Sequence, residues 1–173
     1  MLVMPQPTIS EGKRNHFIGT KVVVLTCLLV ATLDISAALI DSHLRYGTTP
    51  LELFQYIASG ILGKAAFSGG TWTALVGLLL HYFIASSWTV LFFKLYPKLK
   101  IPPAYKIISG ILFGILIWCF MNLIVVPLSR AHRPLFNWNH IIIGALYIIF
   151  LIALPISLIY HKYYPADLNT DQK

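Results

Sequence analysis

Four long runs of apolar residues, separated by short polar connections, dominate the sequence. The runs cover residues 22–40, 72–93, 107–128 and 141–160. In a helix, about 20 predominantly apolar residues are needed to cross a hydrocarbon core of about 30 Å. The runs lack the polar–apolar alternation of a barrel strand, and helices are the other structure that satisfies every backbone polar group in lipid. The pattern therefore predicts an all-α, polytopic membrane protein, built as a four-transmembrane-helix bundle.

A further segment, residues 50–67, combines a helix start with an amphipathic pattern. Thr49, Pro50 and Glu52 form a capping-box sequence, in which the third residue after the N-cap reaches back to it. Polar residues then recur at helical spacing on one face, and apolar residues occupy the other. We predict one additional amphipathic helix that is interfacial or re-entrant, or leans on the bundle. The alternative is a fifth span of about 18 residues that carries Lys64.

The distribution of charge distinguishes these two topologies. The chain has 13 Lys and Arg residues against 6 Asp and Glu, a net charge of +7. With four spans, nine of the 13 basic residues fall on the side of the amino terminus; with five spans, six do and seven lie opposite. Basic residues concentrate on the cytoplasmic side of membrane proteins. Charge therefore favours four spans with both termini cytoplasmic, in a single membrane domain (residues 1–173) with polar tails at 1–16 and 161–173.

Composition excludes several classes of protein. Hydrophobic residues make up 57% of the chain and charged residues 11%. Soluble domains have roughly 45–50% apolar residues and about 25% charged residues. A soluble enzyme, a disordered regulator and a disulfide scaffold do not fit these values. The basic excess lies at helix ends, where orientation and anionic lipid account for it. The expected partner is therefore the lipid bilayer, with no nucleic acid.

The first apolar run also permits a second interpretation. Residues 22–33 resemble the apolar core of a signal peptide, with Ser36-Ala37-Ala38 as a cleavage site. However, Asp34 directly follows this core and apolar residues continue to Ile40. These features favour an uncleaved first span.

Polar residues inside the spans are the most informative positions for function. A charged side chain at the bilayer centre costs at least about 2.5–3.5 kcal/mol, so such groups usually face the bundle interior with a partner. Three polar residues lie on three different spans: Asp34, His81 and Asn122. A rise of 1.5 Å per residue places them at mid-depth or in the outer half of the membrane. We predict an outward-opening polar cluster of Asp34, Lys64, His81, Asn122 and His140, with the basic Arg130 and Arg133 at the outer mouth.

This polar cluster supports two interpretations. Asp34 beside His81 can bind a cation or relay a proton, because histidine titrates near neutral pH. The structural alternative is that these residues fix helix register, with Asp34 paired to Lys64 or Arg45. A zinc site from Asp34, His81 and His140 is chemically possible, but no spacing requires it, so we predict no metal and no cofactor.

The function predicted from the sequence is small-solute, ion or proton handling by an integral membrane protein. The sequence favours a protein that is not an enzyme over one that is. One alternative is a membrane-embedded enzyme acting on a lipid or apolar substrate, with His81 as base or ligand. A purely structural or assembly role is the other. No catalytic residue is predicted.

Two features of the later spans bear on packing. Gly110 and Gly114 have G-x-x-x-G spacing, which permits close helix approach. Packing within the chain is the default interpretation, and a homo-oligomer through these glycines is the alternative. Pro155 cannot donate to the Leu151 carbonyl, which predicts a kink in the fourth span.

From the second span onward the sequence resembles a known family. Leu80-His81-Tyr82, Tyr96-Pro97-Lys98-Leu99-Lys100, the Gly110–Gly114 segment, Val126-Pro127-Leu128 and His140 are similar to motifs of the YagU-type family of bacterial inner-membrane proteins. The resemblance covers about residues 75–160, about half of the chain. It implies a protein of the bacterial inner (cytoplasmic) membrane and assigns no reaction. That family tends to have a histidine before the Pro-Leu of the third span, where Asn122 stands nearest here.

Overall fold

The structure is a computed structural model that describes residues 11–130 and 138–164, and the side chains of residues 19–130 and 142–164. The regular elements in these ranges are all helical, which confirms the all-α prediction. In chain order they are α1 (Glu11–Tyr46), α2 (Pro50–Leu62), η1 (Gly63–Ser68), α3 (Gly70–Leu95), η2 (Tyr96–Leu99), η3 (Pro103–Tyr105), α4 (Lys106–Phe120), η4 (Met121–Val125), α5 (Val126–Leu128), α6 (Trp138–Tyr147), η5 (Ile148–Ala153) and α7 (Leu154–Tyr163).

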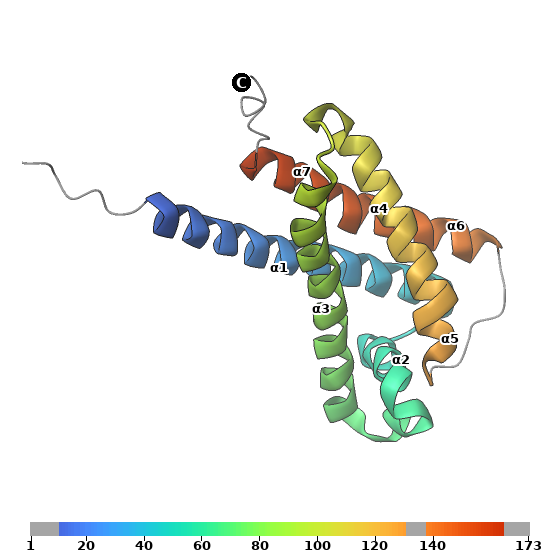
Figure 1. Cartoon of the computed structure of the whole chain (residues 1–173). Coiled ribbons are helices and arrows are strands. Elements are labelled where there is room, and N and C mark those ends of the chain that lie inside the picture. The colour runs from blue at the N-terminus through green and yellow to red at the C-terminus, as the bar shows by residue number, and fades with distance from the viewer. Residues whose placement is uncertain (1–10, 131–137, 165–173) are drawn as a thin grey trace, which may run out of the picture.

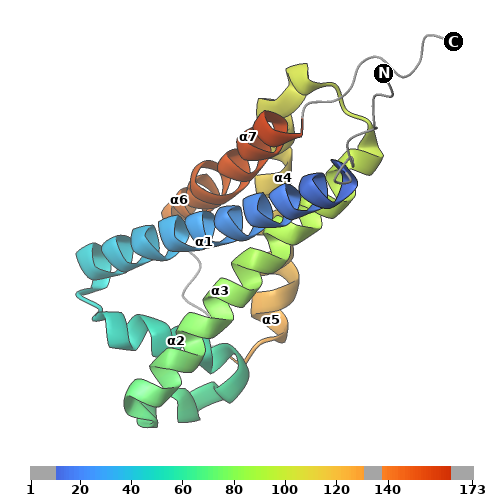
Figure 2. The same ribbon diagram turned by 90° about the vertical axis from the view of Figure 1, so that its left-hand side faces the viewer.

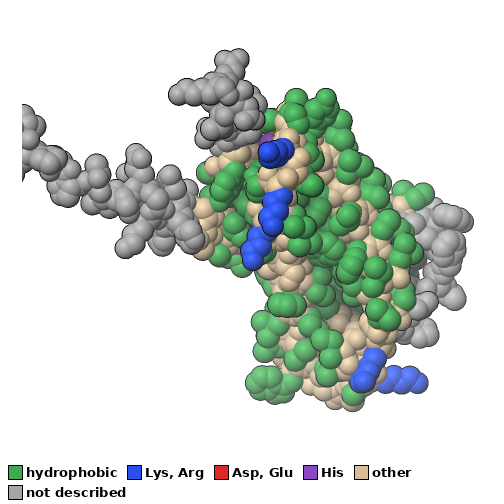
Figure 3. Space-filling model, in the orientation of Figure 1, with side chains coloured by type: hydrophobic (Ala, Val, Ile, Leu, Met, Phe, Trp, Pro, Cys, Tyr) green, Lys and Arg blue, Asp and Glu red, His purple; other side chains and the backbone are tan. Residues whose placement is uncertain are grey.

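Four helical segments in the described ranges are long and apolar enough to cross a membrane. They are Gly19–Tyr46, Gly70–Leu99, Pro103–Leu128 and Ile142–Tyr163. Much of their apolar surface is exposed: Leu79 and Leu123, for example, are 62% and 69% exposed. Figure 3 shows hydrophobic side chains covering most of one face, with Lys and Arg at its two ends. The chain is an integral, multi-pass membrane protein, because a surface of this kind is stable in lipid and not in water.

The four spans form a crossed bundle. Figures 1 and 2 show α1 crossing α3, and the rod made by α6, η5 and α7 running beside α1. The same rod packs against α4. Figure 2 places the beginning of α1, the end of α7 and the α3–α4 connection at one end of the molecule. The shorter α2 and η1 lie at the opposite end, against α3.

The main apolar core lies where the long helices meet. Its fully buried side chains include Val30, Ile117 and Ile156, and partly buried aromatic side chains pack against it. Phe92 stacks on Tyr96 with ring centroids 4.6 Å apart. This core fixes the crossing of α1 and α3 and so fixes which polar side chains of these two helices meet.

The start of α2 confirms the capping box. The Glu52 carboxylate accepts hydrogen bonds from the backbone N–H and the hydroxyl of Thr49, at 2.7 and 2.9 Å. In return, the Glu52 backbone N–H donates to the Thr49 hydroxyl. The α-helix ends at Leu62, because Gly63 takes a positive φ of 61°, and the remainder of the predicted segment is a 3-10 turn.

The polar face of α2 points into the bundle. Gln55 and Ser59 are buried and Ile61 is 57% exposed. The Gln55 amide donates to the carbonyl of Gly70 at 3.1 Å. This inverted arrangement fits a helix that leans on the bundle and turns its apolar face to lipid.

The glycine pair of the third span is used within the chain. A Cβ on Gly110 would lie 2.9 Å from Leu154 Cδ2, and one on Gly114 would lie 2.9 Å from Ile149 Cα. Both glycines are buried. The close approach that G-x-x-x-G spacing permits is therefore made to the fourth span of the same chain.

Two prolines in the spans follow π-helical turns. The turn η5 precedes Pro155, and the Leu154 N–H reaches back five residues to the Ile149 carbonyl. In the third span, η4 precedes Pro127 in the same way. The distortion expected at Pro155 is thus a widened turn, which accommodates a residue that has no N–H to donate.

Candidate functional site

Asp34 and His81 meet inside the membrane-spanning region, where α1 crosses α3. The Asp34 Oδ2 atom lies 4.0 Å from the His81 Nε2 atom. The two side chains are 23% and 12% exposed. A carboxylate and an imidazole from separate spans therefore share one partly enclosed position.

The hydrogen bond of His81 fixes which ring nitrogen carries a proton. Nε2 lies 2.9 Å from the backbone carbonyl oxygen of Ala31, one turn before Asp34 on α1. A carbonyl oxygen only accepts, so Nε2 is the donor. The bond holds the imidazole edge against α1, and Asp34 stands beside a protonated nitrogen.

A second polar contact between α1 and α3 adjoins this pair. The Thr32 hydroxyl and the Tyr82 hydroxyl lie 2.9 Å apart. This contact joins the residue two before Asp34 to the residue after His81. It belongs to the same crossing and joins two hydroxyl groups.

The structure does not bring the remaining described members of the predicted cluster to this pair. Asn122 is exposed, and its amide donates to the Trp118 carbonyl of its own helix at 2.9 Å. Lys64 is exposed on η1. The predicted pairing of Asp34 with Arg45 is not formed either, because Arg45 binds Asp41. Depth along a span was estimated from the sequence, but the direction in which a side chain points depends on helix rotation, which depth does not give.

The outer-mouth residues divide between the described and the undescribed parts of the chain. Arg130 is exposed, and its backbone N–H donates to the Gly60 carbonyl at 2.9 Å, which ties the end of the third span to α2. Arg133 and the side chain of His140 lie outside the described residues. Among the described residues, no three His, Cys, Asp or Glu side chains are placed to hold a metal ion.

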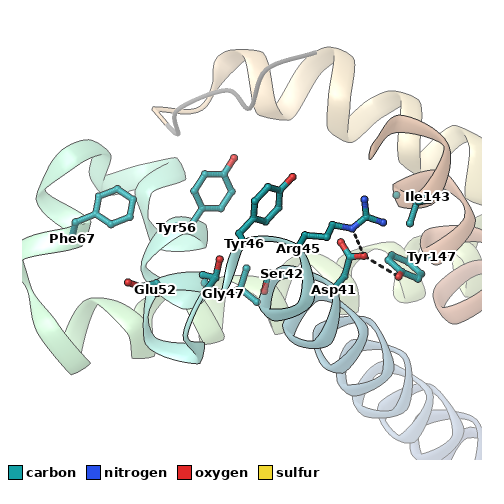
Figure 4. Close-up of a pocket in the computed structure, with 13 residues that line it drawn as sticks. Asp41, Ser42, Arg45, Tyr46, Gly47, Glu52, Tyr56, Phe67, Ile143 and Tyr147 are labelled. Atoms are coloured by element: carbon teal, nitrogen blue, oxygen red, sulfur yellow. Dashed lines mark hydrogen bonds and ion pairs between the residues drawn. The ribbon is translucent and has the colours of Figure 1, made fainter. Parts of the chain in front are cut away.

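A second candidate site lies at the end of the bundle that carries α2. It is a cavity of about 750 Å³ between the last turns of α1, the helix α2 and the helix α6 (Figure 4). Its lining consists of Asp41, Ser42, Arg45, Tyr46, Gly47, Thr48, Glu52, Leu53, Tyr56, Phe67, Ile143, Gly144 and Tyr147. It will be called the outer cavity, where outer denotes only the end of the molecule opposite the beginning of α1 and the end of α7 (Figure 2).

Asp41 is the centre of the polar part of the outer cavity. Its Oδ1 atom accepts from the Arg45 Nε at 2.6 Å and from the Tyr147 hydroxyl at 3.2 Å (Figure 4). Arg45 follows on the same helix at i+4, and Tyr147 comes from the fourth span. Sequence reasoning did not single out Asp41, although its i,i+4 spacing to Arg45 is a signal that was available.

Glu52 supplies a second carboxylate to the outer cavity. The Thr49 backbone N–H and hydroxyl donate to it and lower the pKa of this exposed carboxyl below its usual value. Glu52 is therefore an anion at neutral pH. Burial raises the pKa of the neighbouring Tyr56 hydroxyl, so that ring remains neutral there.

Comparison with known proteins adds no assignment to these two sites. No family model, no curated protein and no solved structure matches the chain. The resemblance to YagU-type proteins stays a prediction from the sequence.

Proposed function

We propose that the protein conducts protons across a bacterial inner membrane through the Asp34–His81 pair. The observation that carries this proposal is the 4.0 Å contact between a carboxylate and an imidazole on two crossing membrane spans. Ionisable groups in spans are costly, and proton relays are among their known uses. Histidine changes charge close to neutral pH, so a neighbouring carboxylate can exchange protons with it.

We propose that protons reach this pair from one face of the membrane by way of the outer cavity. Asp41 follows Asp34 by seven residues on α1, so the two carboxylates lie on the same face of the helix, about 10.5 Å apart along its axis. Asp41 lines the outer cavity. In the proposed orientation both termini are cytoplasmic, as the excess of basic residues on that side favours, and the cavity opens away from the cytoplasm.

The proposal is tested with purified protein in liposomes that contain a pH-sensitive dye. A pH step imposed outside, with the membrane potential clamped by potassium and valinomycin, should dissipate faster than in protein-free liposomes. Asp34→Asn should return the rate to the protein-free level, because the amide cannot exchange a proton, and Asp34→Glu should retain flux. Ser87→Ala is the matched control, since Ser87 is exposed on α3 and donates to its own helix at Phe83.

Two results would count against proton conduction. One is a wild-type rate equal to that of protein-free liposomes. The other is an Asp34→Asn rate equal to that of the wild type, which would leave the pair with a structural role in fixing helix register.

A further inference from the structure

The outer cavity has the size and the walls of a small-molecule site. Its volume of about 750 Å³ lies within the 300–1,000 Å³ that is typical of ligand pockets. Four aromatic side chains line it, from four different elements: Tyr46 of α1, Tyr56 of α2, Phe67 of η1 and Tyr147 of α6. Figure 4 shows the rings of Tyr46 and Tyr56 side by side between Phe67 and Arg45.

The charges of the described lining leave the cavity with one excess negative charge. Two carboxylates, Asp41 and Glu52, stand against one guanidinium, Arg45. Arg45 is bonded to Asp41 at 2.6 Å, so these two charges compensate each other. Glu52 accepts from a neutral backbone N–H and a neutral hydroxyl of Thr49, and its charge is not cancelled by a cation of the lining.

These observations point to a positively charged guest. Aromatic rings attract cations through their negative faces, most strongly where water is displaced. An anionic guest would have to compete with Asp41 for Arg45 and would meet the Glu52 carboxylate. A neutral apolar guest would gain nothing from the Glu52 charge that no cation of the lining cancels.

We propose that the outer cavity binds a hydrophobic organic cation, an ammonium or phosphonium group carried on an apolar body. The aromatic residues would hold the apolar body and the cation, and Glu52 would supply the opposite charge. This inference concerns equilibrium binding at the outer end of the molecule. It does not depend on proton conduction by the Asp34–His81 pair.

The test compares two probes of the same shape and opposite charge. Tetraphenylphosphonium and tetraphenylborate are titrated into the full-length protein in nanodiscs, and binding is measured by calorimetry against empty nanodiscs. The phosphonium is expected to bind saturably, at one site per chain, at least tenfold more tightly than the borate. Equal affinity of the two ions, or phosphonium uptake no greater than in empty nanodiscs, would overturn the proposal.

Variants locate the binding at the outer cavity. Glu52→Gln removes the uncancelled charge and retains the capping box, which accepts Gln at this position. It should weaken phosphonium binding about tenfold, equivalent to 1.4 kcal/mol. Tyr56→Leu should weaken it as well, because it keeps an apolar side chain and removes a ring.

Ala65→Lys is the matched control for charge. Ala65 is exposed on η1 and does not line the cavity, and the substitution changes the net charge of the same end of the molecule by the same +1. It should leave phosphonium affinity within about twofold. Helical circular dichroism and thermal midpoints verify that each variant is folded. A folded Glu52→Gln protein with wild-type affinity would overturn the assignment.

Discussion

Replacing Gly77 with alanine is expected to destabilise the protein by about 2–3 kcal/mol, the upper part of the range of about 1–3 kcal/mol that is typical of overpacking. An added Cβ would overlap the backbone carbonyl oxygen of Phe54 on α2 and lie 3.1 Å from the Ala58 nitrogen. The obstacle is backbone, which a change of rotamer cannot remove. The helices α2 and α3 would have to separate, and the interface that buries Gln55 and Ser59 would be lost with them.

The same substitution at Gly60 is the matched control. The atom nearest to an added Cβ there is Ser129 Cβ at 3.8 Å, an ordinary contact. Alanine is also favoured over glycine in a helix by about 1 kcal/mol, so Gly60→Ala should unfold at or above the wild-type temperature. The measurement is the thermal midpoint in detergent, followed by circular dichroism. Equal midpoints for Gly77→Ala and Gly60→Ala would show that α2 does not pack on α3 as described.

Replacing His81 with glutamine is expected to abolish proton flux while it preserves the fold. The Gln amide can donate to the Ala31 carbonyl as the imidazole Nε2 does. It does not titrate, so a proton cannot pass between position 81 and Asp34. We expect the dissipation rate in liposomes to fall to the protein-free level, with a thermal midpoint close to that of the wild type.

Tyr82→Phe is the complementary variant. It removes the hydroxyl that contacts Thr32 at the same helix crossing. Hydrogen bonds between membrane helices contribute on average about 0.6 kcal/mol, so this variant should be slightly less stable and should still conduct. If Tyr82→Phe and His81→Gln lowered proton flux equally, the flux would depend on the packing of α1 against α3. The Asp34–His81 pair would then have no separate role in proton transfer.

The sequence predicted those features that are determined locally. Long apolar runs of this kind form helices in lipid, whatever they pack against. The four spans could therefore be predicted from the sequence alone. The Thr49–Glu52 capping box is likewise a matter of four neighbouring residues. The spacing of Gly110 and Gly114 indicated close packing, but not that the fourth span would be the partner.

Features that depend on helix rotation were not predictable in the same way. The sequence predicts both Asn122 and His81 at mid-depth or in the outer half of the membrane, yet the Asn122 amide donates to its own helix at Trp118. The amphipathic pattern of α2 shows that the helix has a polar and an apolar face. It does not show which of these faces packs against α3. The contact of Asp41 with Tyr147 joins residues 106 positions apart, and no local pattern in either span indicates it.

The most direct test of the account is the proximity of Asp34 and His81 in a bilayer. Solid-state NMR of protein with ¹³C-labelled Asp and ¹⁵N-labelled His and Arg, in lipid, reports dipolar contacts between carboxyl carbons and side-chain nitrogens. We expect an Asp34–His81 correlation that disappears in His81→Gln, alongside the correlation of Asp41 with Arg45. A sample that gives the Asp41–Arg45 correlation and none between Asp34 and His81 would contradict it.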